Sequence, residues 1–280
     1  MDYVTLNNGV KMPQLGYGVY QTPTEETESC VLTAIKNGYR SIDTAQAYGN
    51  EEGVGQAIVK CGLPREELFI TTKIWISNAG YEKAKASIEE SLKKLKTDYV
   101  DLLLIHQPFG DYYGTYRAME EAYKAGKARA IGVSNFYPDR YIDIAHFAEV
   151  VPAGNQVETH VFNQQVEPQK IMQEYGTQIM SWGPFAEGRN GFFTNETLKM
   201  IADKYQKSVA QVALRFLIQR GVVVIPKSTH KERMIQNFNV FDFALSTNDM
   251  EEIAKLDKKE SLFFSHYDPK IVGYLVGLGK

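Results

Sequence analysis

Short apolar segments alternate with longer segments of helical periodicity along the chain. The apolar segments lie at residues 15–19, 40–42, 68–74, 100–105, 129–133, 154–157, 178–181 and 222–225. Between two of them, Ala84, Ile88, Leu92 and Leu95 recur on one face with the period of an α-helix. Residues 100–105 are nearly all apolar, which is typical of a parallel strand buried on both faces. The pattern therefore predicts parallel strands alternating with helices.

Eight such units without an intervening linker predict an α/β fold, a single (β/α)8 TIM barrel that forms one domain over residues 1–280. The sequence Asn-Asn-Gly at 7–9 separates two short strand-like segments and predicts an N-terminal β-hairpin, which could cover one end of the barrel. A doubly wound sheet is the structural alternative. Such a sheet would be favoured by a glycine-rich phosphate turn, but Gly16 and Gly18 are followed by no third glycine.

Composition narrows the function classes. The net charge of −3 gives no basic field for nucleic acid, and no segment resembles a signal peptide or a membrane span. Cys30 and Cys61 form no CxxC motif and are typical of reduced core residues, which predicts a cytoplasmic protein. The five histidines lack paired spacing, so no metal site is expected.

Polar residues stand at the carboxyl ends of seven consecutive predicted strands, where barrel enzymes build their active sites. The first follows the second strand and the last follow the eighth: Asp43, Lys73, His106, Ser134 with Asn135, Gln156, Trp182, and Lys227 with Ser228. Any one of them could be an ordinary loop residue. Their number, with three ionisable groups on neighbouring strands, favours an active site at this face.

The loop after the second strand contains Asp43 and Tyr48, and Asn50 is expected to cap the helix that follows. A turn aspartate and a packed tyrosine would explain the first two residues if they stood alone. Lys73 interrupts an apolar strand, so its ammonium needs a buried partner, and Asp43 is one strand away. The pair is either a structural ion pair or a means of lowering the pKa of Tyr48 from about 10, which would make it a general acid. His106 is either a core histidine or a group that polarises a substrate oxygen.

A third cluster lies at residues 225–237, with the sequence IPKSTHKERMIQN. Lys227, Ser228 and Arg233 are expected near the N-terminus of a helix that opens at Thr229. Such a helix end is a ready anion site, although a solvated basic turn would have the same composition.

Three separated segments resemble motifs of the aldo-keto reductases. They are residues 38–51 (GYRSIDTAQAYGNE), 130–136 (AIGVSNF) and 225–237, and the shorter KIW at 73–75 and LLIHQP at 103–108 add to the match. The order and spacing of these motifs also agree along nearly the whole chain. Within the family, the chain is similar to bacterial members that reduce diketo-gluconates and small dicarbonyls such as glyoxal and methylglyoxal.

The resemblance implies NADPH-dependent reduction of aldehydes and ketones to alcohols by a barrel without a Rossmann motif. It implies Tyr48 as the general acid, Lys73 and Asp43 as the groups that tune it, and His106 as the group that orients the carbonyl. The substrate would lie among Tyr20, Trp75, Gln107 and Phe109.

The same resemblance assigns the cofactor contacts to seventeen residues: Gly18, Val19, Ser134, Asn135, Gln156, Trp182, Gly183, Pro184, Phe185, Glu187, Gly188, Lys227, Ser228, Thr229, Arg233, Gln236 and Asn237. Ser134, Asn135 and Gln156 would hold the carboxamide, and Trp182 would stack on the nicotinamide. Residues 183–188 would run alongside the pyrophosphate of the cofactor. The 2′-phosphate would be bound by Lys227, Ser228 and Arg233, with Gln236 and Asn237 near the adenine.

The chain departs from the family pattern at several positions. Trp182 stands where many members have tyrosine, and Gln236 where many have glutamate. Gln107 replaces a common tryptophan, so the pocket is expected to be more polar on that side. The tail after Leu262 is short, which leaves the C-terminal substrate loop, and with it the specificity, undetermined.

Two other functions stay open. Lys73 could form a Schiff base in a lyase or aldolase, although Asp43 would keep it charged and a poor nucleophile. The barrel could also be a cofactor-sensing subunit of a larger assembly. The presence of the family's complete catalytic tetrad, Asp43, Tyr48, Lys73 and His106, argues against that role. For a reductase, the expected partner is a small carbonyl substrate, with no nucleic acid or membrane, and the protein is expected to be a monomer.

Overall fold

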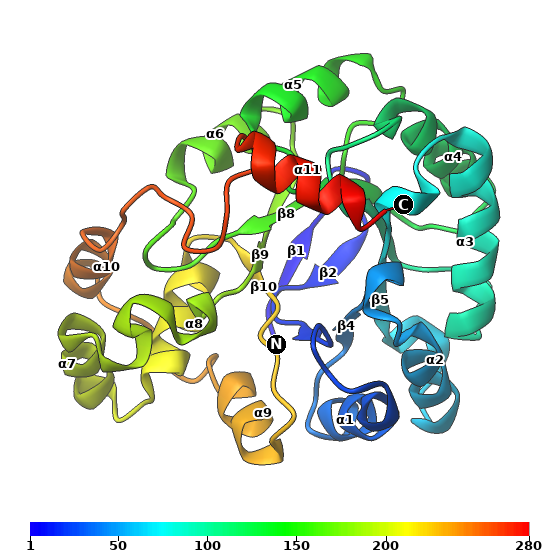
Figure 1. Cartoon of the computed structure of the whole chain (residues 1–280). Helices are drawn as coiled ribbons and strands as arrows, with labels where there is room; N and C mark the ends of the chain where they lie inside the picture. Colours follow the sequence, from blue (N-terminus) through cyan, green and yellow to red (C-terminus); the bar gives the residue numbers. More distant parts are fainter. Residues whose placement is uncertain (280) are drawn as a thin grey trace.

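The computed structural model describes residues 1–279 and has eight parallel strands curled around one axis, with helices on the outside (Figure 1). The strands follow one another in chain order: β3 (Tyr17–Gly18), β4 (Ser41–Asp43), β5 (Phe69–Ile74), β6 (Leu102–Ile105), β7 (Ile131–Ser134), β8 (Gly154–Glu158), β9 (Gln178–Trp182) and β10 (Val223–Val224). A parallel bridge between Leu15 and Val224 joins the two outer strands and closes the barrel. The predicted fold class is confirmed.

Helices surround the barrel: α1 (Thr24–Lys36), α2 (Glu51–Lys60), α3 (Tyr81–Leu95), α4 (Tyr112–Lys124), α5 (Pro138–Phe147), α6 (Val166–Glu174), α7 (Glu196–Tyr205) and α8 (Val209–Gln219) precede the last strand, and α9 (Lys231–Phe238) and α10 (Thr247–Ala254) follow it. A further helix, α11 (Pro269–Gly277), comes after α10. Four 3-10 turns lie in the connections: η1 (Gln46–Tyr48), η2 (Arg65–Glu67), η3 (Ile76–Asn78) and η4 (Ala186–Thr194). None of the helices in residues 1–279 combines the length and apolar character that a membrane crossing needs.

The predicted hairpin is present and closes the N-terminal end of the barrel. It consists of β1 (Tyr3–Thr5) and β2 (Lys11–Pro13), which pair antiparallel. Leu6 and Met12 are buried in the cluster of apolar side chains that fills the barrel interior, and the Asn7 amide donates to the carbonyl of Pro152 at 3.2 Å. Because this end is sealed, the opposite end, where the strands finish, is left for a site.

The core has two layers, one inside the barrel and one between the strands and the helices. The predicted face of α3 is in the outer layer, where Ala84, Ile88, Leu92 and Leu95 are all buried. Asn50 occupies the N-cap position of α2 as predicted, but its side chain makes no capping hydrogen bond to the helix. Its amide instead donates to the Val19 carbonyl at 2.9 Å and ties the β4–α2 loop to the chain after β3.

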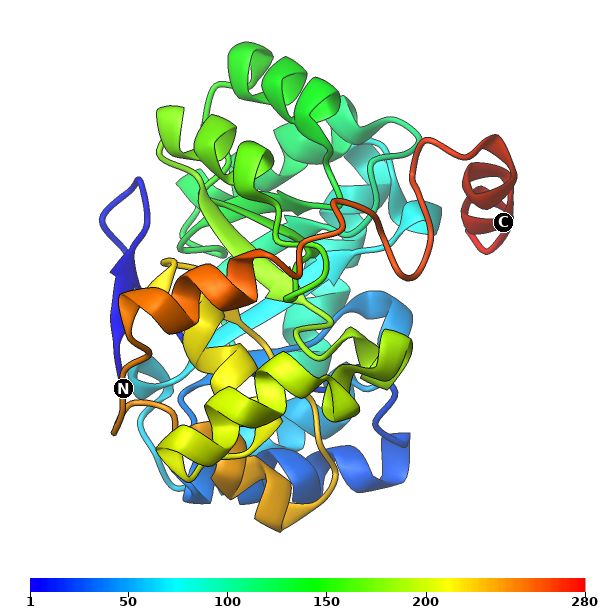
Figure 2. The same cartoon turned by 90° about the vertical axis from the view of Figure 1, so that its left-hand side faces the viewer.

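After α10 the chain crosses the carboxyl end of the barrel and finishes in α11, drawn in red in Figures 1 and 2. From the sequence, only a short segment after Leu262 was expected, and α11 was not predicted. Its apolar residues form a helix that stands away from the barrel body in Figure 2, and Leu275 is its one buried residue within Pro269–Gly277. We call residues 259–279 the tail.

Candidate active site

Lys73 lies fully buried on β5, and its ammonium group is the centre of the site. It donates hydrogen bonds to Asp43 Oδ1 at 2.5 Å, to the carbonyl of Thr44 at 2.9 Å and to the Tyr48 hydroxyl at 3.3 Å. An ammonium carries three N–H donors, so all of them have acceptors. The structure thus brings together three of the four residues predicted to do the chemistry.

The charge of Lys73 is stabilised by these acceptors. Burial opposes the charge, but Asp43 and Tyr48 outweigh it and raise the pKa of Lys73. The amine is therefore protonated at neutral pH and holds no free lone pair. This argues against Lys73 as the nucleophile of a Schiff-base lyase.

Tyr48 follows β4 in the 3-10 turn η1, and its ring is partly exposed at the barrel mouth. Burial of the hydroxyl raises the pKa of Tyr48, while the nearby Lys73 acts in the opposite direction. The expectation that the ammonium brings this pKa below its usual value is therefore wrong for the free protein, because desolvation of the phenolate is the larger effect. Tyr48 is a protonated phenol at neutral pH.

His106 follows β6 and is buried beside the phenol. Its ring lies edge-on to Tyr48, with centroids 5.5 Å apart, and to Trp75, with centroids 5.1 Å apart. Burial, with a smaller contribution from Lys73, lowers the pKa of His106 well below its usual value. The ring is therefore a neutral imidazole. Its Nδ1 is buried without a hydrogen-bond partner in residues 1–279.

A chain of side-chain amides ties the tetrad to the residues predicted to hold a carboxamide. The side-chain amide of Gln156 donates to Asp43 Oδ2 at 2.8 Å, and the Ser134 hydroxyl donates to the backbone carbonyl of Gln156 at 2.8 Å. Asn135 donates to the His106 carbonyl at 3.1 Å and accepts from the Trp182 indole at 2.9 Å. Asn135 adopts a left-handed conformation (φ 62°), which asparagine tolerates better than most residues.

The predicted pyrophosphate loop follows β9 with an unusual backbone. Four of its residues have positive φ: Gly183 at 62°, Ala186 at 50°, Glu187 at 50° and Gly188 at 76°. Pro184 is buried and Phe185 is partly buried. Consecutive residues of this conformation turn the chain sharply, so the loop folds back beside the barrel mouth instead of continuing the axis of β9.

The predicted phosphate-binding cluster lies between β10 and α9. Ser228 is buried and Thr229 partly buried, while Arg233 and Gln236 are exposed on α9 and Asn237 is buried. Lys227 and Arg233 form no hydrogen bond or ion pair with residues 1–279. Their positive charges are therefore available to a ligand.

Backbone hydrogen bonds hold this cluster against the start of the barrel. The amide of Gly18 donates to the Pro226 carbonyl at 3.1 Å, and the Tyr17 hydroxyl donates to the Ser228 carbonyl at 2.6 Å. Val19 is buried beside them. Gly18 and Val19 therefore lie between the acid site and the phosphate-binding cluster, as a cofactor contact requires.

The predicted substrate residues surround the barrel mouth. Tyr20 is 53% exposed and lies 5.0 Å from the Tyr48 ring, centroid to centroid. Trp75, Gln107 and Phe109 line one small hollow. The structure therefore places Tyr20 beside Tyr48 and Trp75 beside His106, and Gln107 and Phe109 follow His106 in the same loop.

Sequence analysis missed the part of the tail that reaches the site. Phe263 lies edge-on to Trp182, with centroids 5.1 Å apart, and His266 reaches Gln107. Glu158 at the end of β8 holds the tail by accepting a hydrogen bond from the Leu262 amide at 2.9 Å. The only signal in the sequence was the run of aromatic residues and histidine at 263–267.

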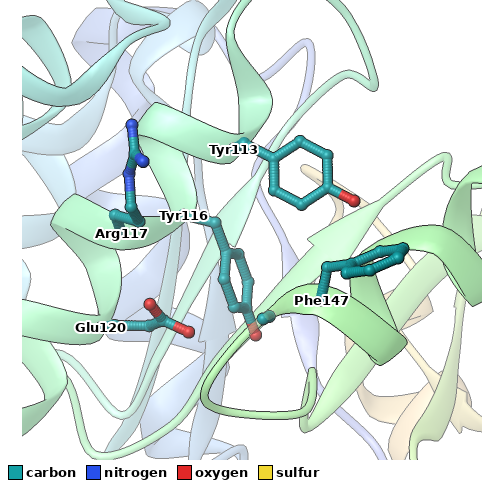
Figure 3. A pocket seen from close by; sticks show the side chains of 6 residues that line it. Tyr113, Tyr116, Arg117, Glu120 and Phe147 are labelled. Atoms are coloured by element: carbon teal, nitrogen blue, oxygen red, sulfur yellow. The ribbon is translucent and has the colours of Figure 1, made fainter.

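A second hollow, of about 300 Å³, lies on the outside between α4 and α5 (Figure 3). Two of its polar groups are already engaged with the backbone of Val150. Tyr116 donates to the carbonyl at 3.0 Å, and Glu120 accepts from the amide at 2.9 Å. These groups support the α5–β8 connection and do not extend the active site.

The structure is thus a closed parallel barrel with a lysine-bound phenol and a neutral imidazole at its carboxyl end. The model of the aldo/keto reductase family matches residues 9–258, and the chain belongs to this family. It is therefore an oxidoreductase acting on carbonyl groups, as predicted. The tail lies beyond the match to the family model.

Named relatives agree with this assignment. The chain is 50% identical to glyoxal reductase from Bacillus subtilis, over 92% of this chain and 94% of the relative. It is 41% identical to methylglyoxal reductase DkgA from Escherichia coli, with the same coverage.

Solved structures agree as well. An aldo-keto reductase from a deep-sea metagenome superposes with a TM-score of 0.93 at 41% identity, over 95% of this chain and 98% of that one. The Bombyx mori aldo-keto reductase, solved in complex with NADP, has a TM-score of 0.88 at 36% identity, over 92% and 94% of the two chains.

Proposed function

We propose that this protein uses NADPH to reduce one carbonyl of small dicarbonyls or keto-sugars to an alcohol, with Tyr48 as the general acid. The observation that carries the proposal is the Lys73 ammonium shared between Asp43 and the Tyr48 hydroxyl. The names of the glyoxal and methylglyoxal reductases, at 50% and 41% identity, support the substrate class.

The hydrogen bonds of Lys73 assign the proton of Tyr48. The phenol oxygen accepts from the ammonium, so its own proton points elsewhere and can pass to a substrate oxygen. As that proton leaves, negative charge develops on the phenol oxygen beside a fixed positive charge. This interaction strengthens in the transition state, which is the requirement for acceleration.

His106 is proposed to orient the carbonyl as a neutral donor. Its Nδ1 is sealed in the protein, so we place the ring proton on Nε2. A neutral imidazole can donate to a carbonyl oxygen without competing with Tyr48 for the proton, because its own low pKa keeps the second nitrogen unprotonated.

The residues present fit NADPH, and the NADP complex of the Bombyx mori relative supports this cofactor. When bound, NADPH supplies the hydride. Trp182, held by Asn135 at 2.9 Å, would offer its indole face to the nicotinamide. Lys227 and Arg233 would bind the 2′-phosphate with charges that no described residue neutralises.

Steady-state reduction tests the proposal through loss of NADPH absorbance. Methylglyoxal is expected to be reduced with a higher kcat/KM than a bulky steroid ketone, because the rings of Tyr20 and Trp75, packed on Tyr48 and His106, would limit the space beside the acid. The reverse ranking would contradict the pocket, and no turnover of any carbonyl would favour a cofactor-sensing role. We also propose a cytoplasmic location, which the free thiols of Cys30 and Cys61 support, and a monomeric state.

A further inference from the structure

A hydrogen-bonded chain links the tail to the predicted substrate pocket. His266 is buried, with its Nε2 at 2.7 Å from Oε1 of Gln107 and its Nδ1 at 3.3 Å from the hydroxyl oxygen of Tyr137. Its ring stacks on Phe109, with centroids 5.8 Å apart and planes 24° apart. The three linked residues come from the tail, the loop after β6 and the N-terminus of α5, and they have no short-range connection in the sequence.

The hydrogen bonds around Tyr137 and His266 indicate where the Tyr137 hydroxyl proton and the His266 ring proton lie. The Tyr137 oxygen accepts a hydrogen bond from the backbone amide of His266 at 3.4 Å, so its own proton is free to go to His266 Nδ1. Burial, with a contribution from Arg140, lowers the pKa of His266 to about 4, so the ring is neutral at neutral pH. The ring proton then lies on Nε2 and is donated to Oε1 of Gln107.

This donation fixes the amide of Gln107. With Oε1 held by His266, the two N–H groups on Nε2 point away from the tail. Nε2 has no hydrogen-bond acceptor in residues 1–279, and it is not among the polar atoms sealed in the protein without a partner. It is therefore not sealed in the protein, and Gln107 directly follows His106, whose ring lies against Tyr48 and Trp75 in the acid site.

We propose that His266 is a positioning residue that holds the Gln107 N–H groups toward the second oxygen of a dicarbonyl substrate. The enzyme would then favour a dicarbonyl over a simple aldehyde of equal size. The inference rests on the proposed function. Methylglyoxal and propanal are matched probes, because they differ only in a carbonyl against a methylene group next to the aldehyde. Their intrinsic reactivities cancel when the ratio of their kcat/KM values in a variant is compared with that in the parent, so the change in the ratio reports the contact to the second oxygen.

The experiment measures this ratio in the parent and in four variants. His266→Phe retains a ring over Phe109 but removes the donor, and His266→Gln returns an amide donor near the position of Nε2. Gln107→Leu removes the group that meets the substrate. Tyr267→Phe is the matched control, since it removes a tail hydroxyl that donates to Asp139 at 3.1 Å but lies outside the chain of bonds to Gln107.

One neutral hydrogen bond corresponds to about a three- to tenfold change. We expect His266→Phe and Gln107→Leu each to lower the methylglyoxal-to-propanal ratio by about that factor, His266→Gln to restore part of it, and Tyr267→Phe to leave it at the parental value. In a double-mutant cycle, His266→Phe should add nothing once Gln107 is leucine, since His266 acts through Gln107.

The possible outcomes distinguish a failure of the proposal for His266 from a failure of the proposed reductase function. If the parent reduces both aldehydes and His266→Phe leaves the ratio unchanged, the inference is overturned and the reductase assignment stands. Equal effects of His266→Phe and Tyr267→Phe on the ratio would show a general role of the tail in stability and would also overturn it. A parent that reduces neither aldehyde overturns the proposed function and this inference together.

Discussion

Replacing Lys73 by methionine separates the structural role of the ion pair from its catalytic one. Methionine keeps much of the side-chain volume but removes the cation that Asp43 and Tyr48 share. Breaking a buried pair by removing one partner costs about 3–5 kcal/mol of unfolding free energy. Asp43 keeps its bond from Gln156 at 2.8 Å, so we expect a loss near the lower end of that range, about 3 kcal/mol.

The same substitution should slow the chemical step. The bond from Lys73 to the developing phenolate is charge-assisted and worth about 1.5–3 kcal/mol, which corresponds to about a ten- to hundredfold loss in the single-turnover rate. Urea unfolding measures the stability, and rapid mixing with saturating NADPH and methylglyoxal measures the rate.

The double variant Asp43→Asn with Lys73→Met is the matched control. It removes both charges, so it should recover much of the lost unfolding free energy because no unpaired carboxylate remains buried. It should not recover the rate, because Tyr48 still lacks its cation. If Lys73→Met unfolds at lower urea but turns over at the parental rate, the ion pair is only structural and does not assist Tyr48.

Three further predictions address the acid, the cofactor and the fold. Tyr48→Phe should lower turnover more than about tenfold while NADPH binding is retained, because the hydroxyl acts in the transition state; a smaller loss would exclude Tyr48 as the acid. Arg233→Ala should raise the Kd for NADPH about ten- to hundredfold and leave that for NADH unchanged, as fluorescence titration would show, because it loses one charged hydrogen bond; equal losses would place the 2′-phosphate elsewhere. Burial opposes the ionisation of Asp249, but hydrogen bonds from Lys204, Ser246 and Tyr205 outweigh it and hold the pKa of Asp249 well below its usual range. A lowered pKa stabilises the folded state above the unfolded value of about 3.9. Asp249→Asn should therefore lower the unfolding free energy by about 1–2 kcal/mol at neutral pH, and its difference from the parent in urea unfolding should shrink as the pH falls below about 4; a constant difference would contradict the linkage.

The barrel could be predicted because its strands are buried on both faces and its helices on one. The apolar segment at 100–105 contains β6, and the face of α3 is the one that its period marked. The exact ends could not be predicted. Within residues 15–19, only Tyr17–Gly18 form the strand β3. Leu15 instead pairs with Val224 in the bridge that closes the barrel, and a local sequence pattern does not reveal so distant a partner.

The grouping of the residues proposed for catalysis could be predicted because strand ends of a parallel barrel meet at one face, so Asp43, Lys73 and His106 had to be neighbours. The direction of the pKa shift of Tyr48 could not. That direction depends on the competition between a known cation and the burial of the hydroxyl, and the burial is set by side chains that arrive from other elements. The sequence therefore predicted Lys73 as the partner of Tyr48, but the direction of the net shift in the pKa of Tyr48 could not be predicted.

The tail marks the limit of such predictions, and for a physical reason. His266 and Gln107 are 159 positions apart, and neither belongs to a periodic segment. A barrel strand cannot change its neighbours without breaking its backbone hydrogen bonds. The tail is held by a few contacts, such as the hydrogen bond from the Leu262 amide to Glu158, so its residues can change at little cost to the core. The acid site is thus fixed by the part of the chain that sequence patterns describe, and the contact proposed to discriminate substrates lies in the part that they do not.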